Sequence, residues 1–238
     1  MMLCTLSKSE LAAYVRGQLS IFFPDGGLLV DIEPYLDETL SKLDYCIRHI
    51  FDRYYKKDGE NYFNHLHTDQ YSMFLYLLSS VIYKHGGNKN LCEKIFYLNK
   101  ALHGIDAFYS VELPEIFMFC HPLGTVLGHA EYSNFLLVYQ NCTVGSNADG
   151  FYPHIGEYVA LYKGASVIGD CRIGNNCKVS AHSLILNQDV PENSIFIGRP
   201  GNFILKTVRQ PDPVWSKSFL DYFQGRDEER ANRAKISG

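Results

Sequence analysis

A six-residue rhythm in the second half of the chain constrains the fold more than any other feature. Every sixth residue from position 155 is a branched aliphatic one: Ile155, Leu161, Val167, Ile173, Val179 and Ile185. The fifth place of each hexad is mostly small, as at Ala165, Cys171 and Ser183. Helices and ordinary strands have periods of 3.6 and 2, so neither produces this pattern. A triangular β-solenoid does, because three hexads make one coil of about eighteen residues with the aliphatic side chains inside.

An earlier run keeps the same rhythm, and we expect its hexad starts to point inward as well. These are Val126, Tyr132, Val138 and Val144. Residues 145–154 are too long for one hexad by about five residues, so a loop should leave the solenoid there. Pro191 ends the series, and a closing segment follows it.

The first hundred residues carry the three- and four-residue spacing of amphipathic helices instead. The apolar stripes cover residues 40–54, 71–82 and 91–102. Thr68 or Asp69 is expected to cap the second helix, and Gly104 to end the third. The predicted organisation is a helical domain over 1–104, a solenoid over 105–206 and a polar tail over 207–238 with an apolar patch at 214–223.

Composition excludes several classes of function. The 238 residues carry a net charge of -4 without a long basic run, which argues against nucleic-acid and anionic-membrane partners. The N-terminus does not read as a signal peptide, and no stretch is apolar enough to span a membrane. Seven scattered cysteines without a CxxC pair predict reduced thiols, no zinc site and a cytoplasmic location.

Residues 65–206 resemble the serine acetyltransferases, a branch of the hexapeptide-repeat acyltransferases. Two stretches carry the resemblance: IDAFYSVELPEIFMFCHPLGTVLGHAEYSNFLLVYQNCTVG, which begins at Ile105, and IGEYVALYKGASVIGDCRIGNNCKVSAHSLIL, which begins at Ile155. The resemblance implies an α+β fold, in which an N-terminal helical domain precedes a left-handed parallel β-helix. It also implies an enzyme that uses acetyl-CoA as its co-substrate and needs no metal.

The resemblance implies that His121 is the general base and that Asp106, fifteen residues earlier, orients it. An alcohol is a poor nucleophile at neutral pH, and an imidazole is suited to taking its proton as the new bond forms. The hydroxyl then attacks the thioester directly, without an acyl-enzyme. Such a base contributes roughly 10²–10⁴ in rate.

Four residues are expected to hold the co-substrate along an edge of the solenoid: Gly145, Lys163, Ala181 and Arg199. Backbone N–H groups near Gly145 would meet the developing oxyanion, and Arg199 would meet CoA phosphates. Counting in hexads also places His121, Gln140, Lys163 and Ala181 at the third position of their hexads, which predicts that they stack on one edge of the prism. The family binds CoA between subunits, so we expect a homotrimer or a dimer of trimers.

The acceptor is expected to be a small molecule that contacts Asp69, Cys120, Tyr152 and His154. Here the sequence departs from the family, which has Asp in place of Cys120 and Arg-His in place of Phe151-Tyr152. These departures favour a sugar or nucleotide-sugar acceptor, whereas the overall motif match favours serine, so both remain open. The chain ends at Gly238 rather than at the Ile that docks into a sulfhydrylase, so that complex is not expected.

Two other classes compete with the transferase hypothesis. A metal enzyme on the same solenoid needs three converging histidines, and His121, His129 and His154 lack suitable spacing. A non-catalytic scaffold would keep the solenoid but would be indifferent to the loss of His121.

Overall fold

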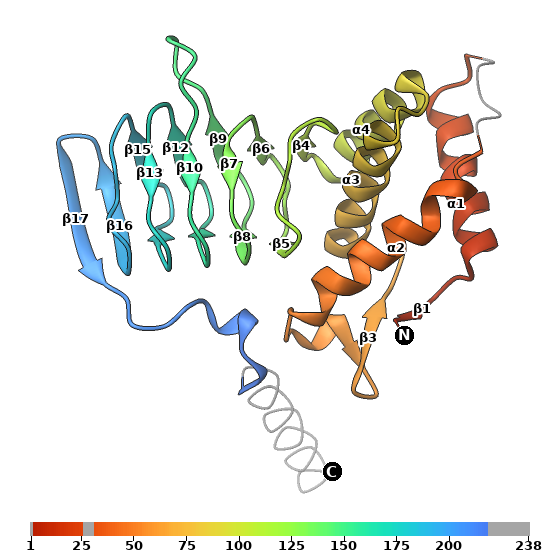
Figure 1. The fold of residues 1–238 in the computed structure, drawn as a ribbon, viewed down its shortest axis with the longest axis horizontal. Coiled ribbons are helices and arrows are strands. Elements are labelled where there is room, and N and C mark those ends of the chain that lie inside the picture. Colours follow the sequence, from red (N-terminus) through yellow and green to blue (C-terminus); the bar gives the residue numbers. More distant parts are fainter. Residues whose placement is uncertain (1, 26–30, 219–238) are drawn as a thin grey trace, which may run out of the picture.

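The computed structural model describes residues 2–25 and 31–218. A helical unit comes first, and a solenoid of stacked coils extends away from it (Figure 1). The predicted fold class, helices followed by a parallel β-helix, is confirmed. Residues 219–223 of the apolar patch predicted in the tail lie outside the described residues.

The helical unit contains four α-helices in the described residues: α1 (Lys8–Phe22), α2 (Glu33–Arg48), α3 (Thr68–Lys84) and α4 (Lys89–His103). A short 3-10 helix, η1 (Arg53–Tyr55), precedes a hairpin. None of the described helices is long and apolar enough to cross a membrane. The sequence patterns missed a small sheet with the order β1-β3-β2, made of β1 (Leu3–Cys4), β2 (Lys56–Lys57) and β3 (Glu60–Phe63).

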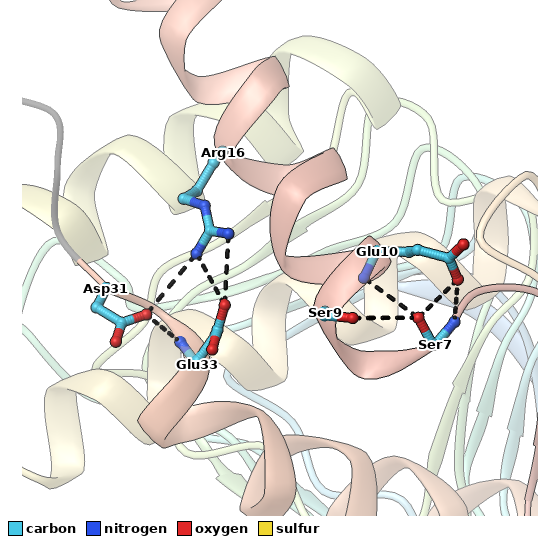
Figure 2. A network of polar contacts seen from close by, with 6 residues as sticks. All are labelled: Ser7, Ser9, Glu10, Arg16, Asp31 and Glu33. Carbon is cyan, nitrogen blue, oxygen red and sulfur yellow. Dashed lines mark hydrogen bonds and ion pairs between the residues drawn. The ribbon is translucent and has the colours of Figure 1, made fainter.

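Polar contacts fix the start of α1 and join it to α2 (Figure 2). The Ser7 hydroxyl accepts from the Glu10 backbone N–H, and the Glu10 carboxylate accepts from the Ser7 N–H at 2.8 Å. This capping box satisfies two N–H groups that the helix itself leaves free. Further along, Arg16 contacts Glu33 at 3.3 Å and Asp31 at 3.8 Å, so the two helices are held together at the surface.

Helix α3 is the centre of the helical unit. All its residues from Asp69 to Ile82 are buried, and it packs against α2, α4 and the solenoid strand β5. A helix surrounded by protein on every side needs no polar face. Its N-cap is His67, so the predicted cap at Thr68 or Asp69 is wrong by one or two residues.

The predicted helix over 40–54 is too long. Helix α2 ends at Arg48, and Tyr54 lies in η1 with 52% of its surface exposed. Helix α4 ends as predicted at Gly104, which adopts φ 65°. A Cβ at this glycine would lie 2.6 Å from the Leu123 side chain, so Gly104 both ends the helix and lets the chain near Leu123 approach.

Three parallel sheets form the faces of the solenoid. One has the order β13-β10-β7, one β17-β16-β14-β11-β8-β5 and one β15-β12-β9-β6-β4. Their strands are β4 (Asp106–Ala107), β5 (Phe117–Phe119), β6 (Val126–Leu127), β7 (Glu131–Tyr132), β8 (Leu136–Val138), β9 (Thr143–Gly145), β10 (His154–Ile155), β11 (Ala160–Leu161), β12 (Ser166–Ile168), β13 (Arg172–Ile173), β14 (Lys178–Val179), β15 (Leu184–Leu186), β16 (Ser194–Arg199) and β17 (Asn202–Thr207). The last two pair antiparallel and close the solenoid, and η2 (Pro213–Trp215) follows.

The register confirms the hexapeptide rhythm. Ile155 pairs with Ile173 and Leu161 with Val179, so one coil takes eighteen residues. The six hexad starts from 155 to 185 are 0–3% exposed. Tyr132 pairs with Ile155 across 23 residues, which is the predicted excess of five at the loop between β9 and β10.

The rhythm breaks one coil earlier, around His121. Phe119 pairs with Val138 and Leu127 with Val144. Eight positions therefore separate Phe119 from Leu127, whereas six separate their partners. Two residues are extra, and the chain bulges between β5 and β6. The predicted inward position of Val126 is wrong for this reason: Val126 is 41% exposed and Leu127 is 1% exposed.

Substitutions at these two neighbours test the register. Leu127→Ala is expected to lower the free energy of unfolding by about 2–5 kcal/mol, because it leaves a cavity between coils. Val126→Ala should change it by less than about 0.5–1 kcal/mol, because the side chain faces outward. Urea unfolding followed by circular dichroism measures both values, and equal losses would contradict the observed register.

Candidate functional site

The bulge presents His121 to solvent. Its side chain is 74% exposed, and its backbone has φ 52°, in the left-handed region. Histidine is among the residues that tolerate this region, but the conformation still costs on the order of 1–3 kcal/mol and persists only where the surroundings impose it. Eight other non-glycine residues of the described part also have a left-handed φ, among them Asn141 and His182 at turns of the solenoid, so the conformation recurs in this fold.

A hollow of about 250 Å³ lies where the bulge meets the helical unit. It is lined by the start of α3, the end of α4 and the bulge: Thr68, Asp69, Leu102, His103, His121, Pro122 and Leu123. These segments are far apart in sequence, and the contacts of α4 with α3 and β4 bring them together. The hollow therefore belongs to the junction of the two units and not to the repeat alone.

Asp69 supplies the charge in this hollow. Its carboxylate is 5% exposed and lies 3.6 Å from His121 Nδ1 (Oδ2 to Nδ1). That separation is an ion-pair contact and slightly too long for a hydrogen bond. An anion buried at one ring nitrogen favours a proton on that nitrogen, which leaves Nε2 free to accept one. The sequence had assigned Asp69 to the acceptor, not to the imidazole.

Cys120 lies beside this pair but is not a nucleophile. Burial, with Asp69 as the next contribution, raises the pKa of the Cys120 thiol to about 12. At neutral pH the side chain is therefore a neutral thiol, and only a thiolate attacks. The Tyr139 hydroxyl lies within hydrogen-bonding reach of the sulfur, and its ring stacks on Tyr162 at a centroid distance of 5.3 Å.

His103 is a second imidazole in the hollow that sequence reasoning missed. Its Nδ1 lies 2.8 Å from the Asn99 amide oxygen, and the residue is 9% exposed. Burial lowers the pKa of His103 to about 4, so the ring is neutral at pH 7. Its position in the last turn of α4 reads as an ordinary helix end, and nothing in the sequence signals its burial.

The lowered pKa of His103 predicts a pH dependence of stability. The unfolded chain binds this proton near pH 6.5, whereas the folded chain resists it until about pH 4. Stability is therefore complete above pH 6.5 and is lost as the pH falls through this window, by up to about 3 kcal/mol. Urea unfolding at pH 7 and pH 4.5 measures the loss. His103→Gln should lose less between these two pH values, and an equal loss in both proteins would contradict the assignment.

Asp106, the predicted partner of His121, makes a different contact. Its carboxylate lies 2.5 Å from Lys100 Nζ, at the surface. In the described residues no ion pair within 4 Å joins it to His121. Asp106 lies on β4, which pairs with β6 at the end of the β15-β12-β9-β6-β4 face of the prism. The orienting role of Asp106 stays a prediction.

The column of residues predicted along one edge of the solenoid is only partly as expected. The Gly164 N–H bonds to the Gln140 carbonyl and the His182 N–H to that of Lys163, so the column of Gln140, Lys163 and Ala181 exists. The equivalent bond below it runs from the Asn141 N–H to the carbonyl of Leu123. Because of the two extra residues, Leu123 occupies the place predicted for His121, which lies beside the column.

The remaining predicted residues lie apart from His121 in a single copy. Tyr152 and His154 line a second hollow of about 620 Å³ below the loop. In it His154 pairs with Glu131 at 2.7 Å, and Tyr152 packs edge-on against His129. Gly145 pairs with Ile168 on the β9–β12 face, and Arg199 is exposed at the far end of the solenoid.

The stacked coils are those of a hexapeptide-repeat β-helix, and the junction site lies where this β-helix meets the helical unit. The family model described as bacterial transferase hexapeptide (six repeats) matches residues 152–187. The chain is 29% identical over 137 residues to the serine acetyltransferase of Synechococcus elongatus, a match that covers 56% of this chain and 53% of that protein. The predicted resemblance is thus confirmed, while the chain spans about half the length of this curated relative.

Solved structures show the same fold. The serine acetyltransferase of Neisseria gonorrhoeae superposes with a TM-score of 0.66 at 22% identity, over 87% of this chain and 82% of that one. A serine acetyltransferase in complex with CoA gives a TM-score of 0.62 at 17% identity, over 83% and 84% of the two chains. The likeness includes the helical unit as well as the solenoid, because it extends over most of both chains.

Proposed function

We propose that the chain is an acetyl-CoA-dependent O-acetyltransferase whose general base is His121. The observation that carries the proposal is an exposed imidazole on a left-handed bulge with a buried carboxylate 3.6 Å from its Nδ1. The matched serine acetyltransferases, one of them solved with CoA, support acetyl-CoA as the co-substrate. The reduced thiols support a cytoplasmic location.

In the proposed reaction, the acceptor hydroxyl lies at His121 Nε2. The ring takes the hydroxyl proton as the oxygen attacks the thioester carbonyl. The C–S bond then breaks, and the imidazolium returns its proton to the CoA sulfur. Asp69 stabilises the transient imidazolium, as a buried carboxylate does in a triad. Backbone N–H groups near Gly145 stay the predicted partners of the oxyanion.

We further propose that the site is completed by a second copy in a homotrimer. The hollow at His121 and the hollow at Tyr152 and His154 do not share a lining residue. An interface along the solenoid edge would let one copy supply the base and its neighbour supply Tyr152, His154 and Lys163. In this arrangement, the predicted acceptor residues and the predicted CoA residues would act together in one site.

A sugar acceptor is the second candidate. Phe151 and Tyr152 are 55% and 47% exposed at the loop, and exposed aromatic rings are apolar platforms with polar edges. The hollow at His121 is lined by no Arg or Lys in the part of the chain described, so one copy offers no cation for the carboxylate of serine.

Release of CoA thiol tests both candidates. The full chain is incubated with acetyl-CoA and either serine or a panel of free and nucleotide-linked sugars. Turnover with any of these alcohols supports the transferase, and the preferred acceptor decides between the two classes. Acetyl-CoA that stays intact with every alcohol would count against the proposed function.

A further inference from the structure

Three metal-ligating side chains lie together at His121: Asp69 and His121 line the hollow, and Cys120 is the residue before His121. Cys120 and His121 are neighbours on the bulge, and Asp69 comes from the first turn of α3. The cysteine sulfur, one ring nitrogen and one carboxylate oxygen all lie within 4.8 Å of one another. A tetrahedral Zn²⁺, with bonds of about 2.0–2.3 Å, separates its ligands by roughly 3.3–3.6 Å. The 3.6 Å between His121 and Asp69 already fits, whereas the sulfur, within 4.8 Å of both, would have to move closer by side-chain rotation.

The donor set selects the kind of cation. One sulfur, one imidazole nitrogen and one carboxylate oxygen suit Zn²⁺ and similar soft or borderline ions. Mg²⁺ and Ca²⁺ prefer oxygen ligands alone, so they are poor candidates. His121 is 74% exposed, which leaves a fourth coordination position open to water.

We propose that the hollow binds one Zn²⁺ through Asp69, Cys120 and His121, and that this ion inhibits the enzyme by occupying the base. The inhibition rests on the proposed function, whereas the binding does not. On binding, the Cys120 S–H bond breaks, the proton passes to solvent and a Zn–S bond forms, with no change of oxidation state. A ring nitrogen that coordinates Zn²⁺ holds no free pair for an acceptor proton, so transfer and metal binding exclude each other.

The sequence could not reveal this site, because Asp69 lies 51 positions before Cys120 and the three residues lack any zinc-type spacing. Cys120 is the decisive member. The resemblance places an Asp here in the serine acetyltransferases, and two carboxylates with one imidazole would be a harder donor set. The substitution of a thiol therefore makes this hollow selective for softer cations.

Cobalt titration of the metal-free full chain tests the binding, in buffer with a phosphine reductant. We expect one Co²⁺ per chain and a sulfur-to-cobalt charge-transfer band in the near ultraviolet. Cys120→Ser should abolish the band, and Asp69→Asn should weaken Zn²⁺ competition by at least about 10–100-fold. Cys4→Ser, which removes an exposed thiol elsewhere, should keep the band. No band in the parent chain, or a band that survives in Cys120→Ser, would overturn the proposal.

The inhibition is tested separately, by measuring CoA release. One equivalent of Zn²⁺ should stop CoA release, and a chelator should restore it. If the band appears and no alcohol is ever acetylated, the proposed function fails while the metal site stands. If transfer continues unchanged at full Zn²⁺ occupancy, the inhibitory role is wrong.

Discussion

Replacing His121 with asparagine is expected to lower kcat/KM for acetyl transfer by about 10²–10⁴-fold, the usual contribution of a general base. Asparagine is the informative substitution because it also tolerates the left-handed φ of 52° at this position, so the bulge is kept. CoA thiol release measures the rate, and the circular dichroism spectrum should match that of the parent chain.

His85→Ala is the matched control. This imidazole also contacts a carboxylate, with its Nε2 2.6 Å from Glu38, but it lies at the end of α3 and outside the hollow. Its loss should change the rate by less than about twofold, since exposed ion pairs contribute little. A His121→Asn protein that retains full transferase activity would refute His121 as the base and would require another group to take the acceptor proton.

Asp69→Asn is expected to lower kcat by about 10²–10⁴-fold while leaving KM for acetyl-CoA unchanged. Removal of the buried anion takes away the group that fixes the ring proton and stabilises the imidazolium, as in triads that lose their carboxylate. Asp106→Asn should cost much less, because it breaks only a partly exposed ion pair with Lys100.

Sequence and structure thus predict different aspartates as the partner of His121. The family resemblance implies Asp106 as the partner of His121, whereas the contact at 3.6 Å favours Asp69. A larger loss in Asp106→Asn than in Asp69→Asn would show that the ring turns toward Asp106 during catalysis. Steady-state kinetics with saturating acceptor separates the effects on kcat from those on KM.

The solenoid was predictable because its core repeats. The six hexad starts from Ile155 to Ile185 are all buried and the eighteen-residue coils pair in register, so a periodic sequence reports directly on a periodic structure. The same counting failed at Val126, because two extra residues shift the register without changing residue type. The residues added in a bulge lie outside the core, and a hydrophobic pattern indicates only which residues are in the core.

The candidate site was harder to predict than the fold. The resemblance identified His121, and the structure shows its ring exposed at a hollow. The proximity of Asp69, the burial of His103 and the meeting of Cys120 with both depend on how the helical unit docks on the first coil. That docking depends on long-range packing between α3, α4 and the solenoid, which no local spacing encodes.

The acceptor depends on a further level of organisation. Tyr152 and His154 lie in their own hollow, so the proposed role of these residues at His121 requires the second copy proposed above. Analytical ultracentrifugation would give the number of copies, and we expect three or six.

A crystal structure of the full chain with bound CoA is the most direct test of His121 as the base. The predicted result places the CoA sulfur near His121 Nε2, with room beside the sulfur for the acetyl group of acetyl-CoA and for an acceptor oxygen about 3–3.5 Å from its carbonyl carbon. A CoA whose sulfur lies far from His121, such as in the hollow between α2 and α3 lined by Tyr76 and Lys84, would contradict it.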